Sequence, residues 1–175
     1  MKNILIIGGS YGIGLELAKE LQTENNVFIA SRTNENLSGL DITHIPFDAT
    51  TDTIDTSILP AVIDGLVYCP GSINLRPFRG LKLETFESDM HINFFSMVKV
   101  IHNLLPQLTA SEQASIVLFS SVAVKMGMPF HTSVSASKGA IEGFAKALAA
   151  EYAPKIRVNV IAPSLTDTPL AEKFL

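Results

Sequence analysis

Short apolar runs recur along the chain and alternate with longer stretches that have helical periodicity. Each run is nearly continuous rather than alternating, and Gly, Ser, Asp or Pro follows it closely. Strands that are covered on both faces have this pattern, which favours a parallel sheet between two layers of helices. The predicted strands are 4–7, 27–30, 44–47, 66–68, 116–119 and 158–161.

Three of the intervening stretches have helical spacing. Apolar residues recur at intervals of four over 13–21, and a long helix is predicted from 86 to 105, where Pro106 is expected to end it. An alanine-rich helix is predicted over 136–153. The links between the second, third and fourth strands are short, so only weak or truncated helices are expected there. The alternation predicts a doubly wound parallel α/β sheet of six strands in three layers.

Composition narrows the class of protein. The chain has 175 residues, of which 47% are hydrophobic and 17% charged, and we expect one domain over residues 1–175. The formal net charge of −4 offers no basic surface to nucleic acid or to an anionic membrane. No apolar run reaches the ~18 residues of a membrane span, and no metal site is predicted. Because the single cysteine, Cys69, cannot form an internal disulfide, we expect a cytoplasmic protein.

A glycine-rich loop, 8–14, follows the first predicted strand and opens the first helix. Gly8 allows a sharp turn, Gly12 lets the backbone approach a pyrophosphate, and Gly14 allows close packing of helix against strand. The helix N-terminus then offers N–H groups to the phosphates. The alternative is a tight turn without a ligand, but the position directly after the first strand favours dinucleotide binding. The predicted coenzyme contacts in this loop are Gly8, Ser10, Tyr11, Gly12, Ile13 and Gly14.

The end of the second predicted strand bears on which coenzyme is bound. An acidic residue here usually holds the ribose 2′-hydroxyl of NAD, whereas an arginine accommodates the 2′-phosphate of NADP. The chain has Arg32 and no acid at this point, so NADP(H) is predicted in preference to NAD(H), unless Arg32 is simply a solvated surface residue. Asp48, after the third strand, is expected either to accept a hydrogen bond from the adenine amine or to cap a helix.

Further motifs follow in a characteristic order. They are Leu66-Val67-Tyr68-Cys69-Pro70-Gly71, Asn93, Ser120-Ser121, Ser135-Ala136-Ser137-Lys138-Gly139-Ala140 and Arg157-Val158-Asn159-Val160-Ile161-Ala162-Pro163. With the glycine loop and Asp48, they resemble the short-chain dehydrogenase/reductase family from Lys2 to about Leu170. The resemblance implies a Rossmann-type sheet, a nicotinamide coenzyme, a small-molecule alcohol or carbonyl substrate, and a homodimer or homotetramer. It also implies coenzyme contacts from Ala49, Cys69, Pro70, Gly71, Lys138, Pro163, Thr166 and Thr168.

The chain departs from the family at one active-site position. The resemblance assigns catalytic roles to Ser121, Lys138 and Asn93. The residue four positions before the lysine, where the family has a tyrosine, is Val134. A phenol beside an ammonium group acts as a general acid or base, because the neighbouring charge lowers its pKa. Valine has no exchangeable proton, and the loss of a general acid costs ~10²–10⁴ in rate.

Three groups are candidates to replace the missing phenol. His131 lies three residues before the valine, and its imidazole is a candidate acid; the alternative is a polar loop residue near the start of the helix. Tyr68 stands where the family has an asparagine, and it either directs its hydroxyl to the coenzyme or packs beside it. A water molecule held by Ser121 and Lys138 is the third candidate. Asn93, a polar residue in an apolar helix, is expected either to kink the helix or to belong to a proton relay.

The sequence is compatible with two functions. One is an NADP(H)-dependent oxidoreductase with an altered proton relay, which the retained serine, lysine and asparagine favour. The other is a non-catalytic NAD(P)-binding sensor or scaffold, which Val134 favours. A purely structural Rossmann domain is opposed by the glycine loop and Arg32. Cys69 is interpreted as a small buried apolar residue rather than a nucleophile, because no cationic neighbour is evident.

The resemblance also bears on the C-terminal end. In the family the chain continues past the position of Leu170 through a helical substrate lid and a final strand, so residues 171–175 are interpreted as the start of that lid. We therefore expect the lid and last strand to be missing, with an open pocket and one exposed sheet edge unless a partner covers it. The identity of the substrate is not predicted, because the lid selects it.

Overall fold

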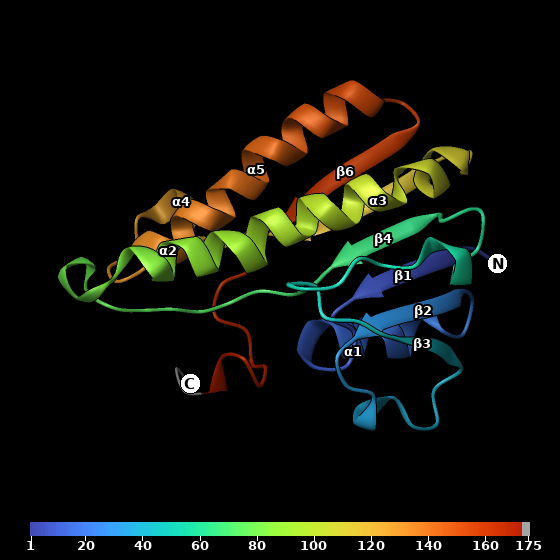
Figure 1. Cartoon of the computed structure of the whole chain (residues 1–175), viewed down its shortest axis with the longest axis horizontal. Coiled ribbons are helices and arrows are strands. Elements are labelled where there is room, and N and C mark those ends of the chain that lie inside the picture. Colours follow the sequence, from blue (N-terminus) through green and yellow to red (C-terminus); the bar gives the residue numbers. More distant parts are fainter. Residues whose placement is uncertain (173–175) are drawn as a thin grey trace.

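One six-stranded parallel sheet forms the centre of the protein (Figure 1). The structure, a computed structural model, describes residues 1–172. The strands run in the sheet order β3-β2-β1-β4-β5-β6, which is the order of the doubly wound Rossmann fold and confirms the predicted α/β class. Their bounds differ from the predicted ones by at most two residues. They are β1 (Asn3–Ile7), β2 (Asn26–Ser31), β3 (Ile42–Pro46), β4 (Gly65–Tyr68), β5 (Ala114–Phe119) and β6 (Ile156–Ile161).

Helices cover both faces of this sheet and complete the three layers (Figure 1). The helix α1 packs on one face, and α3 and α5 pack on the other. The helices are α1 (Gly12–Leu21), α2 (Leu83–Met90), α3 (Ser96–Ala110), α4 (Ala123–Met126) and α5 (Thr132–Tyr152). Shorter turns are η1 (Glu35–Leu37), η2 (Thr56–Ile58), η3 (Phe78–Gly80) and the π-helical η4 (His91–Phe95).

The core has two parts because successive residues of each strand face opposite layers. In β1, Ile6 packs with Ala18 of α1, whereas Leu5 and Ile7 belong to the larger cluster under α3 and α5. Both faces of the central strands are therefore buried, which explains why the apolar runs in the sequence are continuous. The larger cluster includes Leu66, Met97, Leu104, Leu108, Ile116, Leu118 and Ile141.

The predicted long helix differs from the structure in two ways. It is divided into α2, the π turn η4 and α3, and it does not end at Pro106, which lies inside α3. Proline removes one helical hydrogen bond, but the burial of Leu108 holds the following turn against the sheet. The hydroxyl of Thr109 also donates to the carbonyl oxygens of Leu105 and Pro106, at 2.9 and 3.0 Å. Packing therefore overrides the local preference for a helix end.

The alanine-rich helix begins four residues earlier than predicted, at Thr132 rather than at position 136. Its first turn is held by the buried residues Ser133 and Val134. The weak helices expected between β2, β3 and β4 are confirmed, since only η1 and η2 form there. Residues 173–175, in the segment interpreted as the start of a lid, lie outside the described residues.

Candidate functional site

The loop before α1 is shaped by its glycines. Gly8 and Gly12 have φ angles of +77° and +54°, which residues with side chains rarely adopt. A Cβ atom on Gly14 would lie 2.6 Å from the carbonyl oxygen of Gly8, so only glycine allows this approach of loop and helix. Tyr11, at the N-cap of α1, makes no side-chain hydrogen bond to the helix within the described chain. The first backbone N–H groups of α1 are thus available to an anion.

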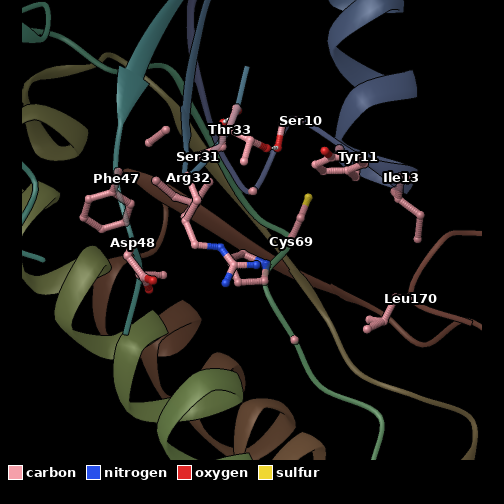
Figure 2. A pocket seen from close by; sticks show the side chains of 18 of the residues that line it. Ser10, Tyr11, Ile13, Ser31, Arg32, Thr33, Phe47, Asp48, Cys69 and Leu170 are labelled. Carbon is pink, nitrogen blue, oxygen red and sulfur yellow. Dashed lines mark hydrogen bonds between the residues drawn. The ribbon is translucent and has the colours of Figure 1, made fainter. Parts of the chain in front are cut away.

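A cavity of about 610 Å³ opens beside this loop, at the carboxyl ends of the central strands (Figure 2). Its volume is in the range of small-molecule sites. Most of the predicted coenzyme contacts line it, namely Gly8, Ser10, Tyr11, Gly12, Ile13, Gly14, Arg32, Asp48, Ala49, Cys69, Pro70, Gly71 and Thr168. The lining does not include Lys138, Pro163 or Thr166. Thr166 is exposed and donates its hydroxyl to the carbonyl of Ser164.

A guanidinium group and three hydroxyl groups lie close together at the end of β2. Arg32 is exposed and extends from the end of the strand into the cavity (Figure 2). The hydroxyl oxygens of Ser10 and Thr33 lie 3.3 Å apart, and Ser31 donates to the carbonyl oxygen of Thr33 at 2.8 Å. A guanidinium group beside hydroxyls fits the chemistry of a phosphate monoester.

Asp48 lies on the same side of the cavity and caps a turn rather than a helix. One carboxylate oxygen accepts hydrogen bonds from the hydroxyl and the backbone N–H of Thr50, at 2.6 and 2.9 Å. These two bonds, and to a smaller extent the charge of Arg32, lower the pKa of Asp48. The carboxylate is therefore ionised over the physiological pH range.

The loop after β4 places Gly71 next to two predicted catalytic residues. A Cβ atom on Gly71 would lie 3.0 Å from Oδ1 of Asn93 and 3.3 Å from Nζ of Lys138. Burial raises the pKa of the Cys69 thiol to about 12, although Lys138 is close enough to oppose this shift. Cys69 thus stays a thiol, as expected for a structural cysteine, but the expectation that it has no cationic neighbour is wrong.

Lys138 is held under the cavity rather than in its wall. Its Nζ donates to the carbonyl oxygen of Phe119, at 3.0 Å. Burial lowers the pKa of Lys138 to about 8, while the charges of Cys69 and Asp89 act in the opposite direction. The ammonium group thus loses its proton much closer to neutrality than an exposed lysine does.

Asn93 is fully buried in η4, where the chain widens from α to π geometry. Its Nδ2 lies 2.9 Å from the carbonyl oxygen of Asp89, 3.0 Å from Oγ of Ser72 and 3.2 Å from Oγ of Ser137. Its Oδ1 accepts from the backbone N–H of Ser72 at 3.3 Å. Asn93 thus lies in a distorted helical turn and also belongs to a polar network. Its two predicted roles, kinking the helix and taking part in a proton relay, are therefore compatible. Such π turns are frequent at functional sites.

Val134 is buried in the first turn of α5, one helical turn before Lys138 and on the same face. Tyr68 directs its hydroxyl to the carbonyl oxygen of Ile92, at 2.9 Å, and burial raises its pKa. It is absent from the cavity lining, so of the two alternatives for Tyr68 the structure favours packing beside the cavity. His131, at the N-cap of α5, has Nδ1 2.6 Å from the carbonyl oxygen of Pro129.

Ser121 is separated from the cavity beside the glycine loop. Its hydroxyl accepts from the backbone N–H of Ala123 at 3.2 Å. It lines a second cavity, of about 720 Å³, together with residues of α5 and β6. Across the described residues, no hydrogen bond joins Ser121 or His131 to Asn93 or Lys138, so their roles stay predictions.

Sequence reasoning overlooked a polar cluster around Asp89. This carboxylate accepts hydrogen bonds from the side chains of Ser72, Asn74 and Ser133. One signal was available, because Asp89 precedes Asn93 by four residues and so lies on the same helical face. The contribution of the loop after Gly71 depends on tertiary structure and left no periodic signal.

Two further properties concern the described residues only. Between Met1 and Glu172, no three histidine, cysteine, aspartate or glutamate side chains are grouped so that they could bind a metal ion. Over the same range, no helix has both the length and the apolar character needed to cross a membrane.

Comparison with known proteins identifies the family. A family model described as short chain dehydrogenase matches residues 2–175, and the chain belongs to this family. Dehydrogenase/reductase SDR family member 7B of Mus musculus is 29% identical over 96% of this chain and 58% of its own length. Cyclopentanol dehydrogenase of Comamonas sp. (strain NCIMB 9872) is 28% identical over 99% of this chain and 76% of its own length.

A solved structure of similar fold supports the same assignment. It is a short chain dehydrogenase of Escherichia coli CFT073 complexed with NADPH. The TM-score is 0.90 at 26% sequence identity, covering 98% of this chain and 80% of the solved one. The protein is therefore a Rossmann-fold member of an oxidoreductase family whose relatives include an NADPH complex. The chain spans 58% to 76% of the length of the two curated relatives described above.

Proposed function

We propose that the protein is an oxidoreductase that transfers a hydride between NADP(H) and an alcohol or carbonyl substrate. The observation that carries this proposal is the convergence of the glycine loop, Arg32 and Gly71 on one cavity, with Asn93 and Lys138 directly behind Gly71. A coenzyme bound there would supply the hydride. The N–H groups of α1 would hold its pyrophosphate, Arg32 its 2′-phosphate, and Lys138 its nicotinamide ribose.

The preference for NADP(H) rests on the chemistry at the end of β2. No carboxylate stands at the position of Arg32, and the hydroxyls of Ser10 and Thr33 lie near it in the same cavity wall. Asp48, on the same side of the cavity, has one carboxylate oxygen occupied by Thr50. The bound NADPH in the related Escherichia coli structure supports this preference.

A non-standard proton relay is part of the proposal. Val134 supplies no proton at the position of the family's tyrosine, and the buried hydroxyl of Tyr68 is directed to a backbone carbonyl. His131 remains a candidate for the proton donor. It is the N-cap residue of α5, and its Nδ1 lies 2.6 Å from the carbonyl oxygen of Pro129. A second function, a non-catalytic NAD(P)-binding sensor or scaffold, is favoured by the same valine.

Two measurements test these functions. Thermal unfolding with NADPH and with NADH should show stabilisation by NADPH at lower concentration, since a ligand that binds the folded state raises the melting temperature. Steady-state turnover should then be measured on cyclopentanol, cyclopentanone and a 3-oxoacyl thioester for the native chain, Val134→Tyr and His131→Ala. Absence of stabilisation by saturating NADPH would contradict both functions. Turnover only with Val134→Tyr would favour the sensor or scaffold.

We also propose that the protein is a cytoplasmic homodimer or homotetramer. The long helices α3 and α5 pack on the same face of the sheet (Figure 1), and Phe95 beside α3 is exposed. These long helices resemble the pair through which members of the family associate, which favours association of copies through this layer. Light scattering of the purified chain measures the state directly, and a monomer at all concentrations would contradict it.

A further inference from the structure

Asp89 is a fully buried carboxylate whose charge is not needed for any step described so far. One oxygen accepts from Oγ of Ser72 at 2.5 Å and from Nδ2 of Asn74 at 2.6 Å. The other oxygen accepts from Oγ of Ser133 at 2.6 Å. Within the described chain Asp89 makes no ion pair. A buried carboxylate without a directly bound cation is costly, so hydrogen bonds must stabilise it.

The carboxylate lies beside the position of the missing phenol. Ser133, which it holds, directly precedes Val134 in the first turn of α5. Asn93 lies one turn after Asp89. Its Oδ1 accepts a hydrogen bond from the backbone N–H of Ser72, and its Nδ2 lies 3.2 Å from Oγ of Ser137 on α5. Asp89 therefore stands at the junction of α2, α5 and the loop after β4, in contact with the residue that precedes Val134.

Ser72 lies between this carboxylate and Gly71, which lines the cavity. The side chain of Ser72 is half-buried and is not itself part of the cavity lining. A hydroxyl has one proton to donate and two lone pairs that can accept. Ser72 donates its proton to Asp89 and accepts from Nδ2 of Asn93, which leaves one lone pair for a further donor.

We propose that Asp89 takes up and returns the proton in place of the missing tyrosine, with the Ser72 hydroxyl as the carrier between its carboxyl group and the substrate oxygen. This inference rests on the proposed function. In alcohol oxidation, the substrate O–H gives its proton to Oγ of Ser72 as Ser72 passes its own proton to Asp89. The electron pair left on oxygen forms the C=O bond as the carbon loses its hydride to the oxidised nicotinamide coenzyme. Reduction is the reverse, and Asp89 exchanges its proton with water between turnovers.

Lys138 is the charged neighbour of this relay. Asp89 raises the pKa of Lys138 against the effect of burial, and Cys69 acts in the same direction. These are the titratable groups that influence the lysine. Removing the negative charge of Asp89 should therefore make Lys138 lose its proton at lower pH, which is measurable without any substrate.

The main test compares Asp89→Asn with Asp64→Asn. Asp64 is a matched control because its carboxylate also accepts from a serine hydroxyl and a backbone N–H, at the opposite end of the sheet. With NADP⁺ and cyclopentanol, or another responsive alcohol, Asp89→Asn should lower kcat by ~10²–10³ and leave KM and the Kd for NADPH almost unchanged. Asp64→Asn should leave all three unchanged. Equal kcat for Asp89→Asn and the native enzyme overturns the relay and leaves the proposed function intact.

Two further variants separate a proton relay from a structural role. Val134→Tyr restores a phenol, so in that background the effect of Asp89→Asn on kcat should shrink to less than about tenfold. Ser72→Ala keeps Asp89 but removes the carrier, and it should lose kcat to the same extent. An undiminished loss in the Val134→Tyr background, or full activity of Ser72→Ala, overturns the inference even if Asp89→Asn folds poorly.

The readout without turnover is the titration of Lys138, followed by ¹³C NMR of the labelled lysine side chain. Asp89→Asn should shift the midpoint to lower pH, whereas Asp64→Asn should not. An unchanged midpoint overturns the charge coupling on which the inference depends. If the native chain binds NADPH but oxidises no alcohol and reduces no carbonyl of the panel, the proposed function fails and the relay fails with it.

Discussion

Replacing Gly14 by alanine tests whether the close approach of α1 to the loop is essential. Alanine is the better helix former by about 1 kcal/mol, so the substitution would be stabilising at an open position. At Gly14, however, the new Cβ atom would lie 2.6 Å from the carbonyl oxygen of Gly8 and 3.0 Å from Cα of Gly9. Both are backbone atoms, so the clash can be relieved only by a shift of the loop.

The expected magnitude comes from a comparison with Gly143 in α5. A Cβ atom there meets no other atom within 4 Å, so Gly143→Ala should raise the free energy of unfolding by about 0.5–1 kcal/mol. Overpacking costs about 1–3 kcal/mol, so Gly14→Ala should lower it by roughly 1 kcal/mol after the helical gain is subtracted. The same chemical change should thus have opposite signs at the two positions.

Urea unfolding measures both variants, and NADPH titration measures the second consequence. A shifted loop misdirects the N–H groups of α1, so Gly14→Ala should weaken NADPH binding by at least about tenfold. Gly143→Ala should leave the Kd unchanged. If both variants are equally stabilised and bind NADPH equally well, the contact between Gly14 and Gly8 does not constrain the loop, and the reasoning is refuted.

Three other predictions concern Lys138, Arg32 and Pro106. The stability of the coenzyme-free protein should rise by about 1 kcal/mol from pH 7 to pH 9, because Lys138 is deprotonated in the folded chain at a pH where the unfolded chain still holds the proton. Urea unfolding should show this rise, and Lys138→Met should abolish it. Arg32→Ala should weaken NADPH binding by at least about tenfold and NADH binding much less, and an equal loss for both would contradict a 2′-phosphate site. Pro106→Ala should raise the free energy of unfolding by about 1–2 kcal/mol, because it supplies the missing N–H of α3, and an unchanged melting temperature would contradict this.

The fold was largely predictable because strand burial leaves a direct signal in the sequence. The continuous apolar runs located all six strands, and the glycine loop, which was predicted to bind a coenzyme, lies in the wall of a cavity at the carboxyl ends of the strands. The error at Pro106 arose because local preference was considered without the burial of Leu108 that follows it. The start of α5 was missed because its first turn, around Val134, is held by tertiary packing rather than by a capping residue.

The candidate site was predictable only in part. Residues in motifs, such as Arg32 and Asn93, could be placed because each follows or lies within one element. Tyr68 was left with two alternatives because the direction of a side chain depends on which face of the strand it occupies, and the face that carries Tyr68 packs under α3. Asp89 was overlooked because its partners come from two separate segments, the loop after β4 and the start of α5, and no spacing along the chain brings them together.

The π turn η4 joins α2 and α3 into one continuous helical segment whose two halves pack against different parts of the protein. Upstream of it, Asp89 accepts hydrogen bonds from Ser72 and Ser133, whereas downstream Met97, Leu104 and Leu108 are buried against the sheet. A π turn accommodates one additional residue, so the part before it is rotated by about 100° from where a regular helix of the same length would place it. Deleting a single residue from η4 would therefore regularise the helix and leave its two halves in nearly the same relative orientation. Regularising the turn at constant length would instead rotate Asp89 away from Ser72 and Ser133.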